Sequence, residues 1–286
     1  MATPGDPDRG GAERFGVRHT DLARVVSALV MAPLAILTAY VGGWLFTLFW
    51  AGAALGVVAE WMLIVDRPRA RLPLTLAGLV LVVAVALIGT NHPVIAIGAI
   101  VLGAGAVAVP ASPGRRGWMA AGLVYAGALL VAPVVLRADP EWGFLAILIL
   151  FATVWASDVA AYFGGRTLQG PKLWPRISPK KTWSGAVIGT VAAMAAAVMV
   201  AKLGGTGHLW PIAVVAAGLS VIGQVGDLLE SGVKRRFGVK DASHVIPGHG
   251  GIMDRVDAFL TASVAAALLG CLRGGLSAPG HGLLLW

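Results

Sequence analysis

Five carboxylates lie inside or at the ends of apolar segments in the second half of the sequence: Asp158, Asp227, Glu230, Asp254 and Asp257. An acid inside a membrane-spanning segment is costly, and it is a functional hypothesis by default. Asp227 with Glu230, and Asp254 with Asp257, have i, i+3 spacing, so each pair shares one helix face. Clustered carboxylates near water suit Mg²⁺, which typically takes one or two carboxylates together with waters and substrate phosphates.

Each of these acids could instead form only a local ion pair with a neighbouring basic side chain. For Glu230 we favour that interpretation, because Lys234 follows it at i+4. For Asp227 and Asp254 we favour metal binding or direct catalysis. We expect the acids of three helices to meet at one depth near the cytosolic boundary.

A glycine-rich turn, GHGG at residues 248–251, precedes one of the acid-bearing segments. Glycines let backbone N–H groups approach a ligand closely, and the N-terminus of the helix that follows is a natural anion site. His249 could hydrogen-bond a phosphate or orient a carboxylate, or it could have a purely structural role in the turn. Charges of both signs surround the turn, namely Lys240, Asp241 and Arg255.

A second basic segment, PKLWPRISPKKTWSG, covers residues 171–185. Ser178, Lys180 and Lys181 lie just before a long apolar run, whereas Lys234 and Arg235 lie just after one. These basic side chains either contact phosphates or extend to the membrane interface as anchors. The nearby GGRTLQGPK lacks the Gly-Lys-Ser/Thr ending of a phosphate-binding P-loop, and we do not interpret it as one.

The elements that must position these residues are membrane spans. Of the 286 residues, 57% are hydrophobic and only 13% are charged, and several apolar runs are long enough to cross a bilayer. We predict an all-α, polytopic integral membrane protein with its active site at cytosolic helix ends. Nine spans can be drawn, at residues 22–40, 43–64, 72–90, 92–110, 117–137, 142–164, 183–202, 209–233 and 252–272.

The basic residues predict the orientation of these spans. With nine spans, 19 Lys and Arg residues fall on one side of the membrane, and only Arg137, Lys202 and Arg273 fall on the other. The positive-inside rule then places the N-terminus and the motif-bearing loops in the cytosol and the C-terminus outside. This distribution accounts for the net charge of +8, so we expect no nucleic-acid partner. We expect an integral protein of the cell (inner) membrane whose active site faces the cytosol.

The chain divides into two parts. Residues 1–21, rich in Gly, Pro and charge, are predicted to be a disordered cytosolic tail, and residues 22–286 a single transmembrane catalytic domain. A cleaved signal peptide is the alternative for the first apolar run. We disfavour it because a long tail precedes that run and no clear small-residue cleavage site follows it. Cys271 is the only cysteine, so no intrachain disulfide can form.

These features together indicate a cytosolic site that combines Mg²⁺, a glycine-rich turn and two basic loops, and that opens towards lipid. Such a site suits a polyphosphate that reacts with a membrane-embedded partner. The residues by themselves therefore predict phosphoryl or nucleotidyl transfer to a lipid, and they leave the nucleotide open.

The segment SGVKRRFGVKDASHVIPGHGGIMDRVD, residues 231–257, resembles the signature of the phosphatidate cytidylyltransferases. That signature is Ser, two residues on Lys-Arg, then Lys-Asp, Pro-x-His-Gly-Gly and Asp-Arg-x-Asp, and every fixed position is present. VGDLLES, ISPKKTW and DVAAYFGGR are also similar to pieces of that family, so the motif-bearing part covers residues 155–260. Two positions depart from the family pattern: Val159 replaces the usual Thr or Ser, and Ser184 replaces the usual Glu.

The resemblance implies the Mg²⁺-dependent reaction CTP + phosphatidate → CDP-diacylglycerol + diphosphate, carried out at the cytosolic face by a homodimer. It also implies that Asp227 and Asp254 hold a paired metal centre, with a monovalent cation such as K⁺ beside the Mg²⁺. The implied catalytic residues are Asp227, Lys240, Asp241, Asp254 and Asp257. The implied substrate-binding residues are Asp158, Ser178, Lys180, Lys181, Lys234, Arg235, His249, Gly250, Gly251 and Arg255.

Two other functions are alternatives for such a sequence. A CDP-alcohol phosphatidyltransferase would also act on lipid at this face, but its Asp-Gly-x-x-Ala-Arg pattern is missing and the sequence contains no Asp-Gly. An ion-coupled transporter would have acids near mid-bilayer and an internal repeat, and the sequence indicates neither.

Overall fold

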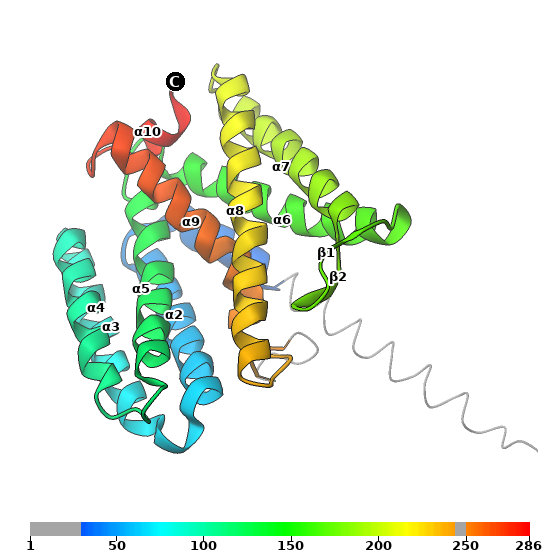
Figure 1. Ribbon diagram of the computed structural model, residues 1–286. Coiled ribbons are helices and arrows are strands. Elements are labelled where there is room, and N and C mark those ends of the chain that lie inside the picture. The colour runs from blue at the N-terminus through cyan, green and yellow to red at the C-terminus, as the bar shows by residue number, and fades with distance from the viewer. Residues whose placement is uncertain (1–29, 244–249) are drawn as a thin grey trace, which may run out of the picture.

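Helices account for most of the chain that this computed structural model describes, residues 30–243 and 250–286 (Figure 1). A helix over Val30–Val41 precedes α2 (Gly43–Asp66), η1 (Arg67–Arg69), α3 (Arg71–Gly89), α4 (Pro93–Ala108), α5 (Arg116–Arg137), α6 (Gly143–Thr167), α7 (Trp183–Leu203), α8 (Leu209–Arg236), α9 (Met253–Gly274) and α10 (Pro279–Leu284). In the described ranges, seven helices are long and apolar enough to cross a membrane. This confirms the all-α, polytopic membrane fold.

Each of the nine predicted spans contains one helix. Two of these helices, Val30–Val41 and α4, are shorter apolar helices, so the count of nine crossings stays a prediction. The predicted tail, residues 1–21, lies outside the described residues, and the division into a tail and a single catalytic domain also stays a prediction.

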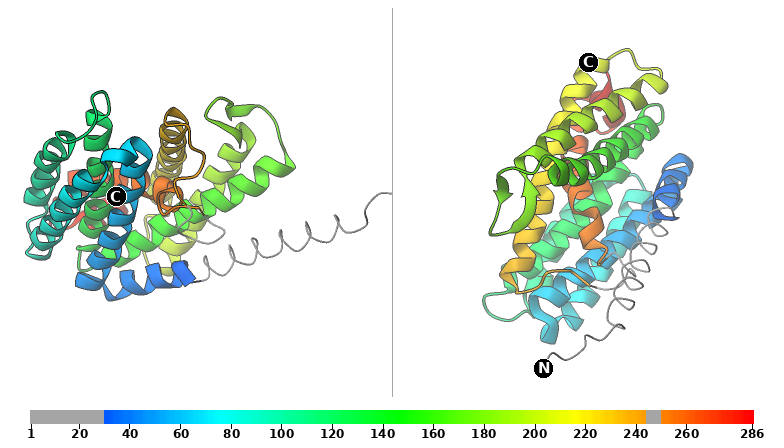
Figure 2. Two further views of the ribbon diagram at one scale, coloured as in Figure 1. Left: turned by 90° about the horizontal axis from the view of Figure 1, so that it is seen from below. Right: turned by 90° about the vertical axis from the view of Figure 1, so that its right-hand side faces the viewer.

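The helices form two groups that α8 and α9 join. On one side α2, α3, α4 and α5 pack on one another, and on the other α6 and α7 form a close pair (Figure 1; Figure 2). Trp50 of α2 stacks on Phe259 of α9 with ring centroids 4.5 Å apart, and Phe151 of α6 packs on the Phe259 ring at 5.3 Å. Because such aromatic contacts bury large apolar areas, they hold α9 between the two groups.

Glycines let α6 and α7 approach one another at backbone contact. A Cβ on Gly185 would lie 2.7 Å from the Ala161 carbonyl oxygen, and a Cβ on Gly189 would lie 2.8 Å from that of Ser157. Small residues at such positions give membrane helices their close packing. A larger side chain at either glycine would push the two helices apart.

The connection between α6 and α7 contains a two-stranded antiparallel hairpin, β1 (Lys172–Trp174) and β2 (Ser178–Thr182). This hairpin was not predicted from the sequence. Thr182 ends β2 and caps α7, because its Oγ1 accepts a hydrogen bond from Gly185 N at 3.1 Å. Ser184, where the family pattern has Glu, donates to the Gln169 carbonyl oxygen and so closes the base of the connection.

The C-terminus lies at the end of the molecule opposite the C-terminal end of α8 (Figure 1). Here Asp139, which is 2% exposed, accepts hydrogen bonds from Glu141 N at 3.0 Å and Trp142 N at 2.8 Å, just before α6. It also accepts one from His281 N of α10 at 2.8 Å. Asp139 thus ties the start of α6 to the C-terminal segment.

Candidate active site

A cleft of about 1420 Å³ opens between α6, α7, α8, α9 and the hairpin. The structure brings most of the predicted site residues to its lining: Asp158, Lys180, Lys181, Asp227, Lys234, Asp241, Gly250, Asp254, Arg255 and Asp257. Ser178, Arg235, Lys240 and Gly251 are not among the described residues that line it. His249 lies outside the described residues.

One wall of the cleft is basic. Lys181 of β2 forms an ion pair with Asp227 of α8, so the hairpin is attached to the helix across from it. Lys172 and Lys180 line the same cleft, together with Arg166 at the end of α6. Several cations along one wall attract a polyanionic ligand and can bind its phosphates.

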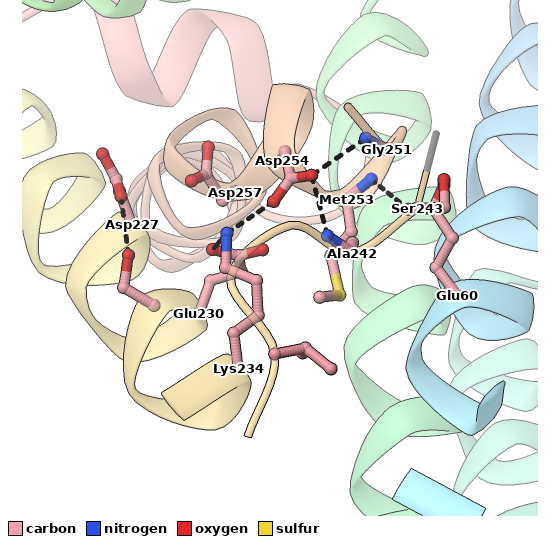
Figure 3. A network of polar contacts seen from close by, with 12 residues as sticks. Glu60, Asp227, Glu230, Lys234, Ala242, Ser243, Gly251, Met253, Asp254 and Asp257 are labelled. Atoms are coloured by element: carbon pink, nitrogen blue, oxygen red, sulfur yellow. Dashed lines mark hydrogen bonds and ion pairs between the residues drawn. The ribbon is translucent and has the colours of Figure 1, made fainter. Parts of the chain in front are cut away.

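The opposite part of the cleft is acidic. Asp227, Glu230 and Asp257 place carboxylate oxygens within 4.8 Å of one another. Asp257 enters this group from α9, whereas the other two come from α8 (Figure 3). Asp227 and Asp257 line the cleft, and Glu230 lies buried behind them. Three hard oxygen donors at this spacing suit Mg²⁺. This donor set differs from the predicted pair, because it contains Asp257 and Glu230 and omits Asp254.

Asp254 is held by the protein itself. Its Oδ1 accepts a hydrogen bond from Lys234 Nζ at 2.5 Å, and its Oδ2 accepts from Ala242 N at 3.0 Å and Gly251 N at 2.9 Å (Figure 3). Lys234 also forms an ion pair with Glu230 at 2.7 Å, which confirms the predicted pair. Lys234 therefore joins the acid cluster on α8 to the first turn of α9.

The first turn of α9 is capped by an acid that the sequence analysis did not select. Glu60 of α2, 4% exposed, accepts hydrogen bonds from Ser243 Oγ at 2.6 Å, Ile252 N at 2.9 Å and Met253 N at 2.8 Å (Figure 3). The signal was available, because Glu60 is the only charged residue between positions 43 and 64.

The described N–H groups at this helix N-terminus already have acceptors within the chain, and the predicted anion site stays a prediction. The N–H groups of Ile252 and Met253 donate to Glu60, and that of Gly251 donates to Asp254. The anions at the start of α9 are the chain's own carboxylates. Gly250 still lines the cleft.

A buried polar network lies beside the cleft. Gln224 lines the cleft, and its Nε2 donates to Thr190 Oγ1 and Ser220 Oγ, both at 3.2 Å. Ser220 Oγ is 2.8 Å from Ser157 Oγ, so the network joins α6, α7 and α8. The sequence analysis missed these residues, because hydroxyl and amide side chains inside a span carry no signal of which helices face each other.

The fold and the cleft together define a polytopic membrane enzyme that handles a phosphate-bearing substrate. The comparisons with known proteins specify the family. A sequence model of the Cytidylyltransferase family matches residues 22–272. The chain therefore belongs to the cytidylyltransferase family and is a nucleotidyltransferase, as the signature in residues 231–257 predicted.

Individual relatives agree with this assignment. A protein named phosphatidate cytidylyltransferase from Brucella suis is 42% identical over 250 residues, which are 87% of this chain and 93% of that protein. Proteins of the same name from Staphylococcus saprophyticus and Rickettsia typhi are 46% identical over 115 residues and 39% identical over 145 residues. These two alignments cover 40% and 47% of this chain, and 44% and 62% of the respective relatives.

Proposed function

We propose that this chain transfers the cytidylyl group of CTP to phosphatidate, forming CDP-diacylglycerol and diphosphate. The observation that carries the proposal is the juxtaposition of the cluster of Asp227, Glu230 and Asp257 with Lys181 and Lys234. All of these except Glu230 line one cleft between apolar helices. The identity to the Brucella suis protein over most of both chains supports the choice of substrates.

The reaction is a displacement at phosphorus. A phosphate oxygen of phosphatidate attacks the α-phosphorus of CTP, the bond from that phosphorus to the oxygen bridging to the β-phosphate breaks, and diphosphate leaves. The attacking oxygen is already anionic near neutral pH, so no strong general base is required. The barrier comes from bringing two anions together and from the charge on diphosphate. Lys181, Lys180 and Lys172 can lower it by holding phosphate oxygens along the basic wall.

We include Mg²⁺ in the proposal, with a monovalent cation such as K⁺ as a second ion. Asp227, Glu230 and Asp257 are the residues that would hold Mg²⁺, because their oxygens converge on one point. Bound there, Mg²⁺ would offset the charge of the triphosphate and of the departing diphosphate. Asp254, the other predicted ligand, would act by holding Lys234 and the start of α9 in place.

We further propose that the protein lies in the cell (inner) membrane, with the cleft facing the cytosol, and that it acts as a homodimer. The distribution of Lys and Arg supports the orientation, because 19 of 22 fall on the side of the motif-bearing loops. The resemblance to the family supports the dimer.

A direct assay tests the proposed reaction. Purified protein in mixed micelles of detergent and phosphatidate is incubated with Mg²⁺ and each of the four ribonucleoside triphosphates in turn. We expect a liponucleotide and diphosphate in equal amounts with CTP, and neither when diacylglycerol replaces phosphatidate, because diacylglycerol lacks the attacking phosphate. Absence of liponucleotide with CTP, or a higher yield with another nucleotide, would show that the proposed substrates are wrong.

A further inference from the structure

Glu60 connects α2, which contributes no described residue to the lining of the cleft, to the loop and helix that do. We propose that Glu60 is a positioning residue for the transfer reaction: it fixes the stem of the 243–252 loop and the first turn of α9 relative to α8. This inference rests on the proposed function. It assigns Glu60 no contact with substrate.

The three hydrogen bonds come from both ends of the loop. Glu60 Oε1 accepts from Ser243 Oγ, before the loop, and from Ile252 N, after it, while Oε2 accepts from Met253 N. One carboxylate therefore contacts described residues on both sides of the sequence segment that contains the Pro-x-His-Gly-Gly motif. Both of its oxygens are used, so the loop stem and the helix start are fixed together.

The negative charge of Glu60 is stabilised by its contact with the first turn of α9. Within the described ranges, its hydrogen-bond donors are two backbone N–H groups and a hydroxyl, with no basic side chain among them. A carboxylate that is 4% exposed needs a compensating positive potential. The first turn of α9 supplies it, because its N–H groups have no intrahelical partner and lie at the positive end of the helix dipole.

The backbone at Gly251 packs closely against the carboxylate of Glu60. A Cβ on Gly251 would lie 2.5 Å from Glu60 Oε2, so only glycine allows the chain to pass this close. Asp254 follows Met253 directly, and Asp257 lies one helical turn further on. A shift of the first turn would therefore move both aspartates relative to Asp227 and Lys234.

The chain offers a matched control for a purely structural role. Asp139 is also buried, and it also accepts three hydrogen bonds, two from backbone N–H groups just before α6 and one from His281 N of α10. It precedes α6, whose first residue, Gly143, lies about 22 Å along the helix from Asp158 at 1.5 Å per residue. Removing either carboxylate removes a similar set of hydrogen bonds. Of the two, only Glu60 contacts Ser243, Ile252 and Met253, which lie next to cleft-lining residues such as Asp254.

The experiment compares Glu60→Gln, Glu60→Asp and Asp139→Asn with the unmodified full-length protein. The amide of Gln places a donor against the N–H groups of α9, whereas Asp keeps the charge and withdraws it by about 1.5 Å. For each variant, thermal stability in detergent is measured beside kcat and KM for CTP, per mole of folded protein. We expect both Glu60 variants to lower kcat/KM by about 10- to 100-fold, because ångström-scale misplacement of reacting groups costs that much. Asp139→Asn should lower thermal stability and leave both kinetic constants unchanged.

Three results would overturn the proposal. The first is a folded Glu60→Gln protein with unmodified kcat and KM. The second is an equal loss of kcat/KM in Asp139→Asn at equal loss of stability, since Glu60 would then act only through the fold. If Glu60→Gln does not accumulate in folded form, Glu60→Asp provides the same test, and unmodified kinetics in it would be the third. Absence of transfer by the unmodified protein would instead contradict the proposed function, so the two failures are distinguishable.

Discussion

Lys181 of the hairpin pairs with Asp227 of α8, and this contact joins the basic wall of the cleft to its acid cluster. Both side chains are partly exposed, at 27% and 29%, so the pair is open to a ligand. A phosphate bound in the cleft would compete with the carboxylate of Asp227 for the same ammonium group. Removing either partner is therefore expected to alter both the basic wall and the acid cluster.

Lys181→Arg tests whether this lysine binds phosphate or only anchors the hairpin at the membrane interface. Either residue could extend to the interface, but a planar guanidinium does not replace a point charge in a tight site. We expect kcat/KM for CTP to fall about tenfold at unchanged expression. Lys202→Arg, at the far end of α7, is the control and should have no effect. If the two variants behave alike, Lys181 is an anchor.

Asparagine substitutions separate the two sets of candidate metal ligands. Asp227→Asn and Asp257→Asn keep the side-chain size and remove a charged ligand, and we expect transfer to fall by orders of magnitude and to need more Mg²⁺. Asp254→Asn should also lose activity, because it weakens the contacts to Lys234 and the loop. Its residual activity should keep the unmodified Mg²⁺ dependence, as measured by Mg²⁺ titration of transfer. A shifted Mg²⁺ requirement in Asp254→Asn alone would restore the Asp227–Asp254 pair as the metal site.

Glu230→Gln should be milder than either substitution at the other two acids. Its amide still offers an oxygen, and Lys234 keeps Asp254 as a partner. We expect kcat to fall about tenfold, the lower end of the loss typical of residues that orient the ligands of a metal ion. Turnover as low as that of Asp227→Asn would make Glu230 an essential ligand.

Cysteine labelling tests the orientation. Arg176→Cys in the hairpin and Ser277→Cys between α9 and α10 both lie at exposed positions, and Cys271→Ala removes the native thiol. In sealed right-side-out vesicles, an impermeant thiol reagent should label position 277 and spare position 176. The reverse pattern would place the cleft on the outer side of the membrane.

Gly189→Ala tests the close packing of α6 and α7. The new methyl group would lie 2.8 Å from the Ser157 carbonyl oxygen, so the helices must separate. We expect destabilisation of about 1–3 kcal/mol, which is typical of overpacking, and a lower thermal midpoint in detergent. Gly218→Ala, with nothing within 4 Å of the new atom, is the matched control. Equal stability of the two variants would contradict the close contact.

The helices were predictable from the sequence, and part of the site was not. Apolar runs of about 20 residues have one stable solution in a bilayer, so each predicted span contains a helix. The hairpin over 172–182 was missed because its strands are short and polar, without the alternation that marks a strand.

The acids illustrate a different limit. Spacing placed Asp254 and Asp257 on one helix face, but it could not tell which of them faces α8. In the structure the carboxylate of Asp254 accepts hydrogen bonds from Lys234 and from Ala242 N, whereas that of Asp257 lies in the cluster with Asp227. Glu60 stands out as the charged residue between positions 43 and 64, but its role as a cap was not predictable. Its partners lie almost 200 residues further along the chain, and no local pattern connects them.

The contact of Glu60 with α9 bears on how much of the chain makes an autonomous unit. The recognisable motifs all fall within residues 155–260, and some relatives align over less than half of this chain. A fragment with the motifs alone would nevertheless leave the start of α9 without its cap and Phe259 without Trp50. The first half of the chain, which has few motifs, thus supplies part of the scaffold of the second half. A design that transfers the signature to another bundle of helices would therefore also need an equivalent of α2.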